Sequence, residues 1–326
     1  MGLVLIGTGG TIASRSTRQG ATASVRAEDL LETLTPQWRE QFSVEPLDLQ
    51  TAGSFALTLD DMLAVATTAV EHASRSSVEG VVVTHGTDSL EETAFLTDLL
   101  YGGRPPIVFT GAQRTFDAPL PDGPENLALA LRTAASRSMR DRGVLVAFQG
   151  AVLRATGVRK QHTWDLHAFR GDDTSTGNSS DRSTLDGAMA PITGPMPTVA
   201  CVLGVPGADG SAVRDAISHG PDGLVFQGTG IGNASPGDAN ALAEAVSQGI
   251  PVLVTTRVAA GPTRPVYGNG GGKTLQDSGA VLAGELSTAQ ARVLLALCLV
   301  DTPPTEALQR AERWISRHAT VPTSTN

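Results

Sequence analysis

The chain has 326 residues, of which 40% are hydrophobic and 17% are charged, a composition typical of a globular protein and not of a disordered one. Its formal net charge of −9 argues against nucleic acids and acidic membrane surfaces as partners. No stretch approaches the roughly 20 apolar residues of a membrane span, and the first residues lack signal-peptide features, so we expect a cytoplasmic location.

The first expected element is a short apolar strand, Leu3 to Ile6, which leads into a turn rich in glycine and threonine. The turn is Gly7-Thr8-Gly9-Gly10-Thr11-Ile12-Ala13. Glycines let a backbone approach a ligand closely. A dinucleotide-binding turn would need a third glycine where the chain has Ile12, so that interpretation fails. Two threonine hydroxyls remain, and a role as caps of backbone groups explains them equally well on local grounds.

Residues 14–26 are rich in Ser, Thr, Gly and Arg and show no apolar period, which predicts a mobile surface loop. Because this segment directly follows the glycine turn, it is compatible with a lid over a site. An ordinary surface excursion fits it equally well.

Strands and helices then alternate with short linkers, which is typical of a parallel α/β sheet. Strands are expected at residues 42–49, 81–84, 107–110 and 143–148, and helices at residues 27–34, 58–72, 90–100 and 124–136. Val152 and Leu153 are compatible with a hairpin after the last of these strands.

One expected strand in this domain is followed by two adjacent polar side chains. The apolar run Val81 to Val83 leads to a hydroxyl and a carboxylate side by side, Thr87 and Asp88. Residues 89–92 have the acids of a first helical turn. Thr87 and Asp88 are therefore expected at the carboxyl end of a parallel strand, the edge where open α/β sheets bind ligands. An ordinary helix cap is the simpler interpretation of an isolated Thr-Asp pair.

The second half of the chain predicts a separate domain. The best linker candidate is residues 181–197, between an N-terminal domain of residues 1–180 and a C-terminal domain of residues 198–326. Strands are expected at 199–205, 223–227 and 251–255, and helices at 210–218, 238–247, 288–300 and 305–318. The fold class is thus α/β, with a larger N-terminal parallel-sheet domain and a smaller, Rossmann-like C-terminal α/β domain.

Neither a metal site nor a phosphate loop is expected. Cys201 and Cys298 each lie in an apolar run and are interpreted as buried core thiols. His162 and His167 have no nearby Cys or Glu to complete a metal site. The segment 268–274 lacks the glycine that a phosphate loop needs at position 267, so it is interpreted as a flexible glycine turn.

Three expected strand ends carry small hydroxyls, those of Thr11, Ser54 and Thr87, which are the candidate reactive groups. Because the chain has no serine or cysteine elbow, the nucleophile of an enzyme here would be a threonine, which needs a base. Lys160 can be that base if it is buried enough to lose its proton, with Asp88 holding it in place. On its own, Lys160 would be interpreted as a solvated surface lysine.

Several motifs, spread over nearly the whole chain, resemble those of the bacterial-type L-asparaginases. They are Thr8-Gly9-Gly10-Thr11-Ile12-Ala13, Gly53-Ser54, Thr84 to Thr93, Thr110-Gly111-Ala112-Gln113-Arg114, the segment around Lys160, and Ala289 to Leu295. The resemblance implies an amidohydrolase that converts L-asparagine to L-aspartate and ammonia through a threonyl acyl-enzyme, without a cofactor. A broad glutaminase-asparaginase and a non-catalytic amino-acid-binding protein stay open. The acidic charge argues against an amidotransferase subunit.

The resemblance also implies a role for each matching residue. Thr11 matches the nucleophile, while Thr87, Lys160 and Asp88 match a second triad that moves protons and positions water. The substrate-binding candidates are Gly10, Ser54, Phe55, Gly86, Thr87, Asp88 and Ala112. Ser54 and Asp88 match residues that hold the α-carboxylate and the α-ammonium. A homodimer or homotetramer is implied, in which the partner's C-terminal domain completes each site.

Three positions depart from the family pattern. Residues 14–26 contain no tyrosine, although the family's lid loop carries one that helps to activate the nucleophile. Phe55 stands where the family usually has glutamine, and residues 259–268 offer no match for the glutamate of the partner subunit. We hypothesise that Tyr267 enters the neighbouring site as a catalytic residue and supplies the missing phenol.

Overall fold

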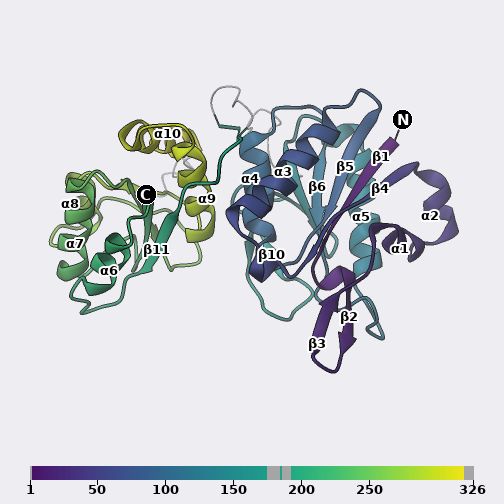
Figure 1. Cartoon of the computed structure of the whole chain (residues 1–326), viewed down its shortest axis with the longest axis horizontal. Helices are drawn as coiled ribbons and strands as arrows, with labels where there is room; N and C mark the ends of the chain where they lie inside the picture. The colour runs from purple at the N-terminus through teal and green to yellow at the C-terminus, as the bar shows by residue number, and fades with distance from the viewer. Residues whose placement is uncertain (1, 175–183, 186–191, 319–326) are drawn as a thin grey trace, which may run out of the picture. The chain divides into compact units, whose positions relative to one another are not determined.

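The computed structural model describes residues 2–174, 184–185 and 192–318, which divide between residues 185 and 186 into two compact units (Figure 1). Of the predicted linker, residues 181–197, residues 181–183 and 186–191 lie outside the described residues. Within the described residues, no helix combines the length and the apolarity that crossing a bilayer would need.

The N-terminal unit is built on a six-stranded sheet in the order β4-β1-β5-β6-β7-β8. The strands are β1 (Gly2–Gly9), β4 (Val44–Ala52), β5 (Val78–Thr84), β6 (Ile107–Thr110), β7 (Val144–Phe148) and β8 (Ala151–Arg154). Neighbouring strands are parallel except β7 and β8, which form an antiparallel hairpin. The predicted parallel sheet and the hairpin after residue 148 are therefore confirmed.

Helices cover both faces of this sheet, which explains why the strands read as continuous apolar runs. The helices are α1 (Ala27–Glu32), α2 (Pro36–Gln41), α3 (Leu59–Ala73), α4 (Leu90–Leu100) and α5 (Gly123–Ala135). Side chains alternate along β1, so Val4 and Ile6 join the core cluster that contains residues of α3 and α4. Leu3 and Leu5 join the cluster with residues of α1 and α5. Each such buried aliphatic side chain contributes about 1.5–3 kcal/mol.

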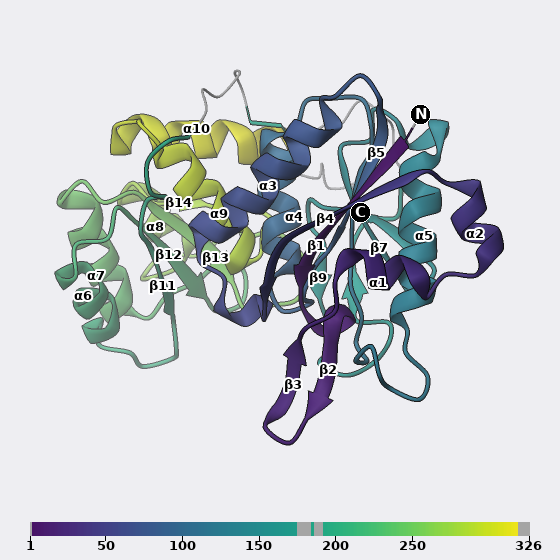
Figure 2. The same ribbon diagram turned by 45° about the vertical axis from the view of Figure 1, so that its right-hand side comes forward.

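The segment 14–26, predicted to be an irregular surface loop, forms a β-hairpin instead. Its strands, β2 (Ser14–Thr17) and β3 (Gly20–Ala23), pair in antiparallel register and are labelled in Figure 2. Gly20 closes the turn with φ of 110°, a conformation that glycine adopts without strain. The prediction was wrong because most of the hairpin's side chains are exposed on both faces, so no apolar alternation marks the strands.

Several shorter elements were also missed. They are α2, the strand pair β9 (Arg159–Lys160) and β10 (Phe169–Arg170), and 3-10 turns at Thr11–Ala13, Ser54–Ala56 and Arg137–Met139. Each of these elements except α2 has only two or three residues, too few for a period to appear in the sequence. Two of the 3-10 turns carry candidate site residues, Thr11 and Ser54.

The C-terminal unit has a parallel sheet in the order β11-β12-β13-β14. Its elements are β11 (Val199–Leu203), α6 (Ser211–Ser218), β12 (Gly223–Gly228), α7 (Pro236–Ser247), β13 (Val252–Thr256), α8 (Gly272–Asp277), β14 (Val281–Leu282), α9 (Thr288–Leu299) and α10 (Pro304–Arg317). Val213, Leu242 and Leu275, from three helices, pack with strand residues in one core cluster. The predicted smaller α/β domain is confirmed.

Two expectations for the C-terminal unit need correction. Cys298 is buried in α9, and burial raises its pKa to about 12, but Cys201 is exposed. Cys201 lies on the edge strand β11, in which Val199 and Val202 are buried but Cys201 and Leu203 are exposed, so an apolar neighbourhood in sequence did not imply burial. The segment 268–274 is not wholly a turn, because α8 begins at Gly272.

Candidate functional site

The carboxyl ends of β1 and β5 meet through two glycines. A methyl group added to Gly10 would lie 2.3 Å from the Cα of Gly86, and Gly10 itself has a φ of 75°. A methyl group on Gly86 would lie 2.4 Å from the hydroxyl oxygen of Ser54. Only residues without a Cβ allow this approach. The chain segments that carry Thr11, Thr87 and Ser54 therefore lie against one another.

The two threonines of the glycine turn have different surroundings. The hydroxyl of Thr8 is buried and donates to the carbonyl of Thr84 at 2.8 Å, so Thr8 ties β1 to β5. For Thr8 the interpretation as a cap of a backbone group is correct. Thr11 is half-buried in the 3-10 turn that begins directly after Gly10.

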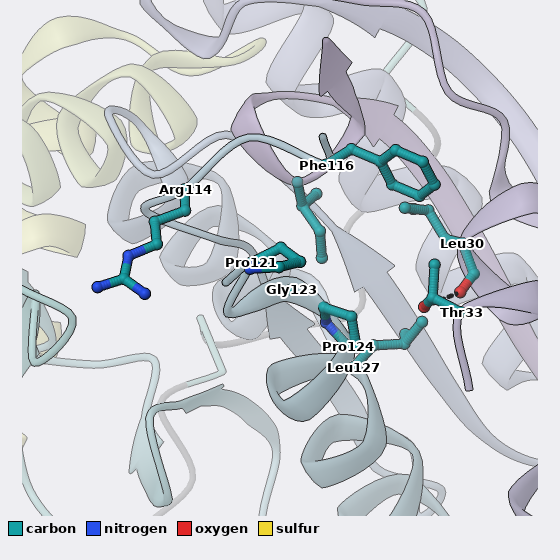
Figure 3. A pocket seen from close by; sticks show the side chains of 9 residues that line it. Leu30, Thr33, Arg114, Phe116, Pro121, Gly123, Pro124 and Leu127 are labelled. Atoms are coloured by element: carbon teal, nitrogen blue, oxygen red, sulfur yellow. Dashed lines mark hydrogen bonds between the residues drawn. The ribbon is translucent and has the colours of Figure 1, made fainter. Parts of the chain in front are cut away.

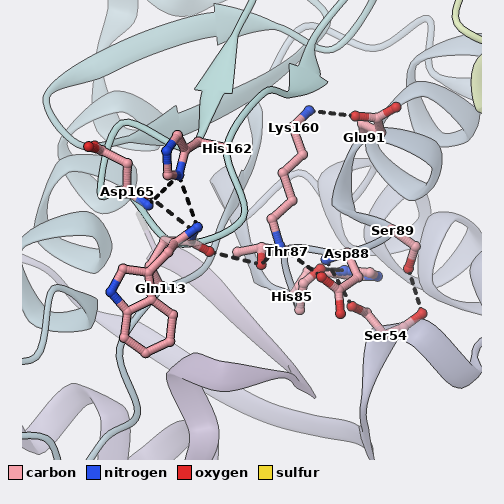
Figure 4. A network of polar contacts seen from close by, with 12 residues as sticks. Ser54, His85, Thr87, Asp88, Ser89, Glu91, Gln113, Lys160, His162 and Asp165 are labelled. Carbon is pink, nitrogen blue, oxygen red and sulfur yellow. Dashed lines mark hydrogen bonds and ion pairs between the residues drawn. The ribbon is translucent and has the colours of Figure 1, made fainter. Parts of the chain in front are cut away.

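Lys160, Thr87 and Asp88 form one polar cluster (Figure 4). The ammonium of Lys160 lies 2.8 Å from the hydroxyl oxygen of Thr87 and 2.7 Å from a carboxylate oxygen of Asp88. The side chain of Lys160 is only 20% exposed, whereas that of Asp88 is 54% exposed. Lys160 is thus not the solvated surface lysine that its local sequence indicates.

Glu91 holds the backbone of Lys160, a contact that the sequence did not reveal. Its carboxylate accepts a hydrogen bond from the backbone N–H of Lys160 at 2.6 Å (Figure 4). Glu91 stands in the first turn of α4, where an acid is explained by the helix dipole alone. The short strand β9 is thereby attached to α4, and the side chain of Lys160 is aimed at Thr87.

Ser54 joins the same cluster through hydrogen bonds on both of its oxygens. Its hydroxyl accepts from the backbone N–H of Asp88 at 3.2 Å, and its carbonyl accepts from the hydroxyl of Ser89 at 2.8 Å. Ser54 is buried. Phe55, the next residue, is 83% exposed, and its ring lies over Gly53. Phe55 therefore adds an exposed aromatic ring where a polar group was expected from the family pattern.

The turn after β6 brings Ala112 and Gln113 to the same edge of the sheet. The buried carboxylate of Asp122 accepts from the backbone N–H groups of Gln113 and Arg114, each at 2.9 Å. Ala112 is buried, and the side-chain oxygen of Gln113 accepts from the hydroxyl of Thr87 at 3.2 Å. A rigid turn thus faces the Thr87 cluster.

His85 lies beneath the cluster, fully buried. Its Nδ1 is 2.8 Å from the carbonyl oxygen of Gly86, so a neutral ring with the proton on Nδ1 donates to that oxygen. Burial lowers the pKa of His85 to about 4. Its Nε2 has no partner among the described residues, and its ring lies near that of Phe109. His85 thereby supports the backbone just before Thr87.

An apolar cavity of about 150 Å³ is lined in part by Ile12, the residue after Thr11 (Figure 3). Its lining residues are Ile12, Leu30, Thr33, Arg114, Phe116, Pro121, Gly123, Pro124 and Leu127. None of Thr87, Asp88 and Lys160 lines it, so it lacks the polar groups of the cluster.

The remaining candidate residues are placed as follows. In the described residues no group of three or more His, Cys, Asp or Glu side chains could hold a metal ion. The Nδ1 of His162 instead accepts from the backbone N–H groups of Trp164 and Asp165. Tyr267 belongs to the C-terminal unit, between β13 and α8, and is 59% exposed.

Comparisons with known proteins cover nearly the whole chain. A family model described as "Asparaginase, N-terminal" matches residues 2–184, and one described as "Glutaminase/Asparaginase C-terminal domain" matches residues 198–311. The chain is 30% identical over 311 residues to the L-asparaginase of Bacillus licheniformis, covering 92% of this chain and 95% of that protein. It is 34% identical over 313 residues to a probable L-asparaginase of Deinococcus radiodurans, covering 91% of this chain and 92% of that protein.

A solved structure gives the same match in three dimensions. The crystal structure of a probable cytoplasmic L-asparaginase from Campylobacter jejuni superposes with a TM-score of 0.82 at 27% sequence identity. The superposition covers 95% of this chain and 98% of that chain.

The burial of His85 predicts a pH dependence of stability. The unfolded chain binds a proton at this residue below about pH 6.5, but the native state does so only near pH 4, so its contribution is complete above pH 6.5 and is lost as the pH falls toward 4. Denaturant unfolding of the wild type and of His85→Asn, between about pH 7.5 and pH 5, should show a loss about 2 kcal/mol larger in the wild type. Equal losses in both proteins would contradict a neutral buried His85.

Proposed function

The chain belongs to the asparaginase family, and we propose that it hydrolyses the side-chain amide of L-asparagine to L-aspartate and ammonia. One observation carries the proposal beyond the family match. Lys160 contacts both Thr87 and Asp88 at the edge of the sheet where Gly10 and Gly86 bring Thr11 alongside. A hydroxyl, an amine and a carboxylate are the groups that a proton-transfer triad needs.

In the proposed mechanism the hydroxyl oxygen of Thr11 attacks the amide carbon. Backbone N–H groups beside Gly10, Thr87 and Ala112 stabilise the negative oxygen of the tetrahedral intermediate. The intermediate collapses when the carbon–nitrogen bond breaks and the nitrogen takes up the proton of Thr11. Ammonia departs, and an aspartyl ester of Thr11 remains. Water then attacks the ester, activated through Thr87 and Lys160, and restores the hydroxyl of Thr11.

Substrate selectivity follows from the groups around Ser54. Its hydroxyl lies beside Asp88 and Gly86 and is suited to the α-carboxylate, while the carboxylate of Asp88 is suited to the α-ammonium. Phe55 offers no hydrogen bond, so we expect weaker ground-state binding and a raised KM. An extra methylene changes binding by only about 1–3 kcal/mol, so glutamine competes with asparagine as a substrate.

We further propose a homodimer or homotetramer in the cytoplasm. Large apolar side chains are exposed in each unit of the single chain, Phe55 and Trp164 in one and Val266 and Tyr267 in the other, and such surfaces suit burial against a partner. The name of the Campylobacter jejuni protein supports the location, although the Haemophilus influenzae relative is called periplasmic. The domain division at residues 181–197 is supported by the gap between the two family matches.

Removal of either threonine should stop hydrolysis. We expect Thr11→Ala to lower kcat on L-asparagine by at least about 10³-fold because the nucleophile is lost, and Thr87→Ala by about 10²–10⁴-fold because proton transfer is lost. Ammonia release would be measured side by side on asparagine, glutamine and their D-forms. Thr68→Ala is the matched control, because Thr68 lies on α3 and its hydroxyl donates to the backbone carbonyl of Ala64 within the same helix.

Two outcomes would contradict this proposal. Either threonine variant retaining most of the wild-type activity with an unchanged circular dichroism spectrum would overturn the assigned roles. A folded wild type that binds asparagine but releases no ammonia would instead identify a non-catalytic amino-acid-binding protein.

Tyr267 is proposed to complete the site of the partner subunit. Tyr267→Phe should lower kcat by about 10²-fold because the phenol that assists Thr11 is lost. Tyr101→Phe, the other tyrosine, should affect stability only, since its buried hydroxyl donates to the carbonyl of Pro105. Mixing Tyr267→Phe with Thr11→Ala subunits should recover activity that neither variant has alone. Unchanged turnover of Tyr267→Phe, or no recovery on mixing, rejects this role.

A further inference from the structure

Gln113 joins the Thr87 cluster to a neighbouring loop, and nothing in the sequence pattern gave it a role. We propose that Gln113 is a positioning residue, which orients the hydroxyl of Thr87 and couples it to residues 161–168, the Trp164 loop. The proposal rests on the proposed function, because it concerns the proton transfer that Thr87 performs there.

The two ends of the Gln113 side-chain amide face different partners. Its oxygen accepts from the hydroxyl of Thr87 at 3.2 Å, and its nitrogen donates to the backbone carbonyl of Asp165 at 3.1 Å. Figure 4 shows the side chain between Thr87 and Asp165. Because a carbonyl can only accept, the contact with Asp165 determines which end of the amide faces Thr87.

This orientation sets the direction of the hydrogen bonds at Thr87. A hydroxyl has one proton to donate, and with Gln113 as its acceptor the lone pairs of Thr87 face Lys160. The ammonium of Lys160, 2.8 Å away, then donates to Thr87. Without Gln113 the hydroxyl would be free to rotate, and the lone pairs of Thr87 would lose their fixed orientation toward Lys160.

The backbone of Gln113 and the loop that its side chain contacts are both firmly held. On one side, Asp122 accepts from the backbone N–H of Gln113, and Asn126 donates to both Asp122 and the carbonyl of Gly111. Because this backbone is fixed, a displacement of the Gln113 side-chain amide at one end shifts the other end.

On the other side, the Trp164 loop is a compact turn. The ring of His162 accepts from two of its backbone N–H groups at 3.1 and 2.8 Å, and the carboxylate of Asp165 accepts from the N–H of His167 at 2.8 Å. The turn presents Trp164, which is 82% exposed, beside the site. A movement of this loop against a bound substrate would thus reach Thr87 through one amide group.

A matched pair of variants separates the contact with Thr87 from the stability of the loop. Gln113→Met removes both amide hydrogen bonds at nearly equal volume. Gln161→Met removes a hydrogen bond within the loop, from Gln161 to the carbonyl of His167 at 3.1 Å, and does not touch Thr87. We expect Gln113→Met to lower kcat on L-asparagine about tenfold with KM changed less than about threefold, and Gln161→Met to keep kcat within about twofold.

The coupling can also be measured without turnover, by amide hydrogen exchange across residues 161–168. Thr87→Val lacks the donor to Gln113, and exchange in the loop should rise about threefold. Because Thr87 also contacts Lys160, which adjoins the loop, the change is transmitted through Gln113 only if Thr87→Val adds no further rise in a Gln113→Met background. Gln113→Met should raise it at least as much. Lys160→Met provides no comparison, because Lys160 adjoins the loop in sequence.

The outcomes distinguish this proposal from the proposed function. An active wild type whose Gln113→Met variant keeps its kcat, or loses no more than Gln161→Met, overturns the role of Gln113. Unchanged loop exchange in Thr87→Val overturns the coupling. A wild type that releases no ammonia overturns the proposed function alone, and the exchange measurement then still decides whether Gln113 couples Thr87 to the loop.

Discussion

The backbones of Gly10 and Gly86 touch because neither residue has a Cβ, and the arrangement of the site depends on that contact. Parallel pairing of β1 with β5 brings the two turns to one edge of the sheet, and the missing side chains let them close on each other. The residues that follow, Thr11 and Thr87, then stand on adjacent segments. Two hydroxyls from positions far apart in sequence can serve one small substrate only under this constraint.

Around this contact, hydrogen bonds from neighbouring segments fix the position of the polar groups. Glu91 holds the backbone of Lys160, Asp122 holds the turn of Gln113, and His85 holds the carbonyl of Gly86. These supports come from three separate segments of the chain, so several independent contacts fix the polar cluster. A partly exposed pair such as Lys160 and Asp88 adds little to folding stability, about 0–1 kcal/mol.

Much of the fold could be predicted from the sequence because its long elements have clear periods. Apolar runs marked the parallel strands, and residues 58–72 carried the amphipathic pattern of helix α3. The hairpin at residues 14–26 was missed because most of its side chains are exposed, and Cys201 was misjudged because the apolar run of β11 contains both buried and exposed residues. Lys160 was ambiguous for another reason. Its burial comes from Thr87, Asp88 and Glu91, which lie about 70 positions away. The roles of Glu91 and Gln113 depend on such distant contacts too, and no local pattern marks them.

The central claim is that the hydroxyls of Thr11 and Thr87 face one small cavity and act on the same carbonyl group. A crystal structure of the protein with its proposed product, L-aspartate, tests this most directly. We expect the β-carboxylate of aspartate to lie within hydrogen-bond distance of both hydroxyls, with the α-carboxylate at Ser54. Aspartate bound with only one of the two threonines in contact, or bound elsewhere while the two hydroxyls point to opposite sides, would contradict the claim.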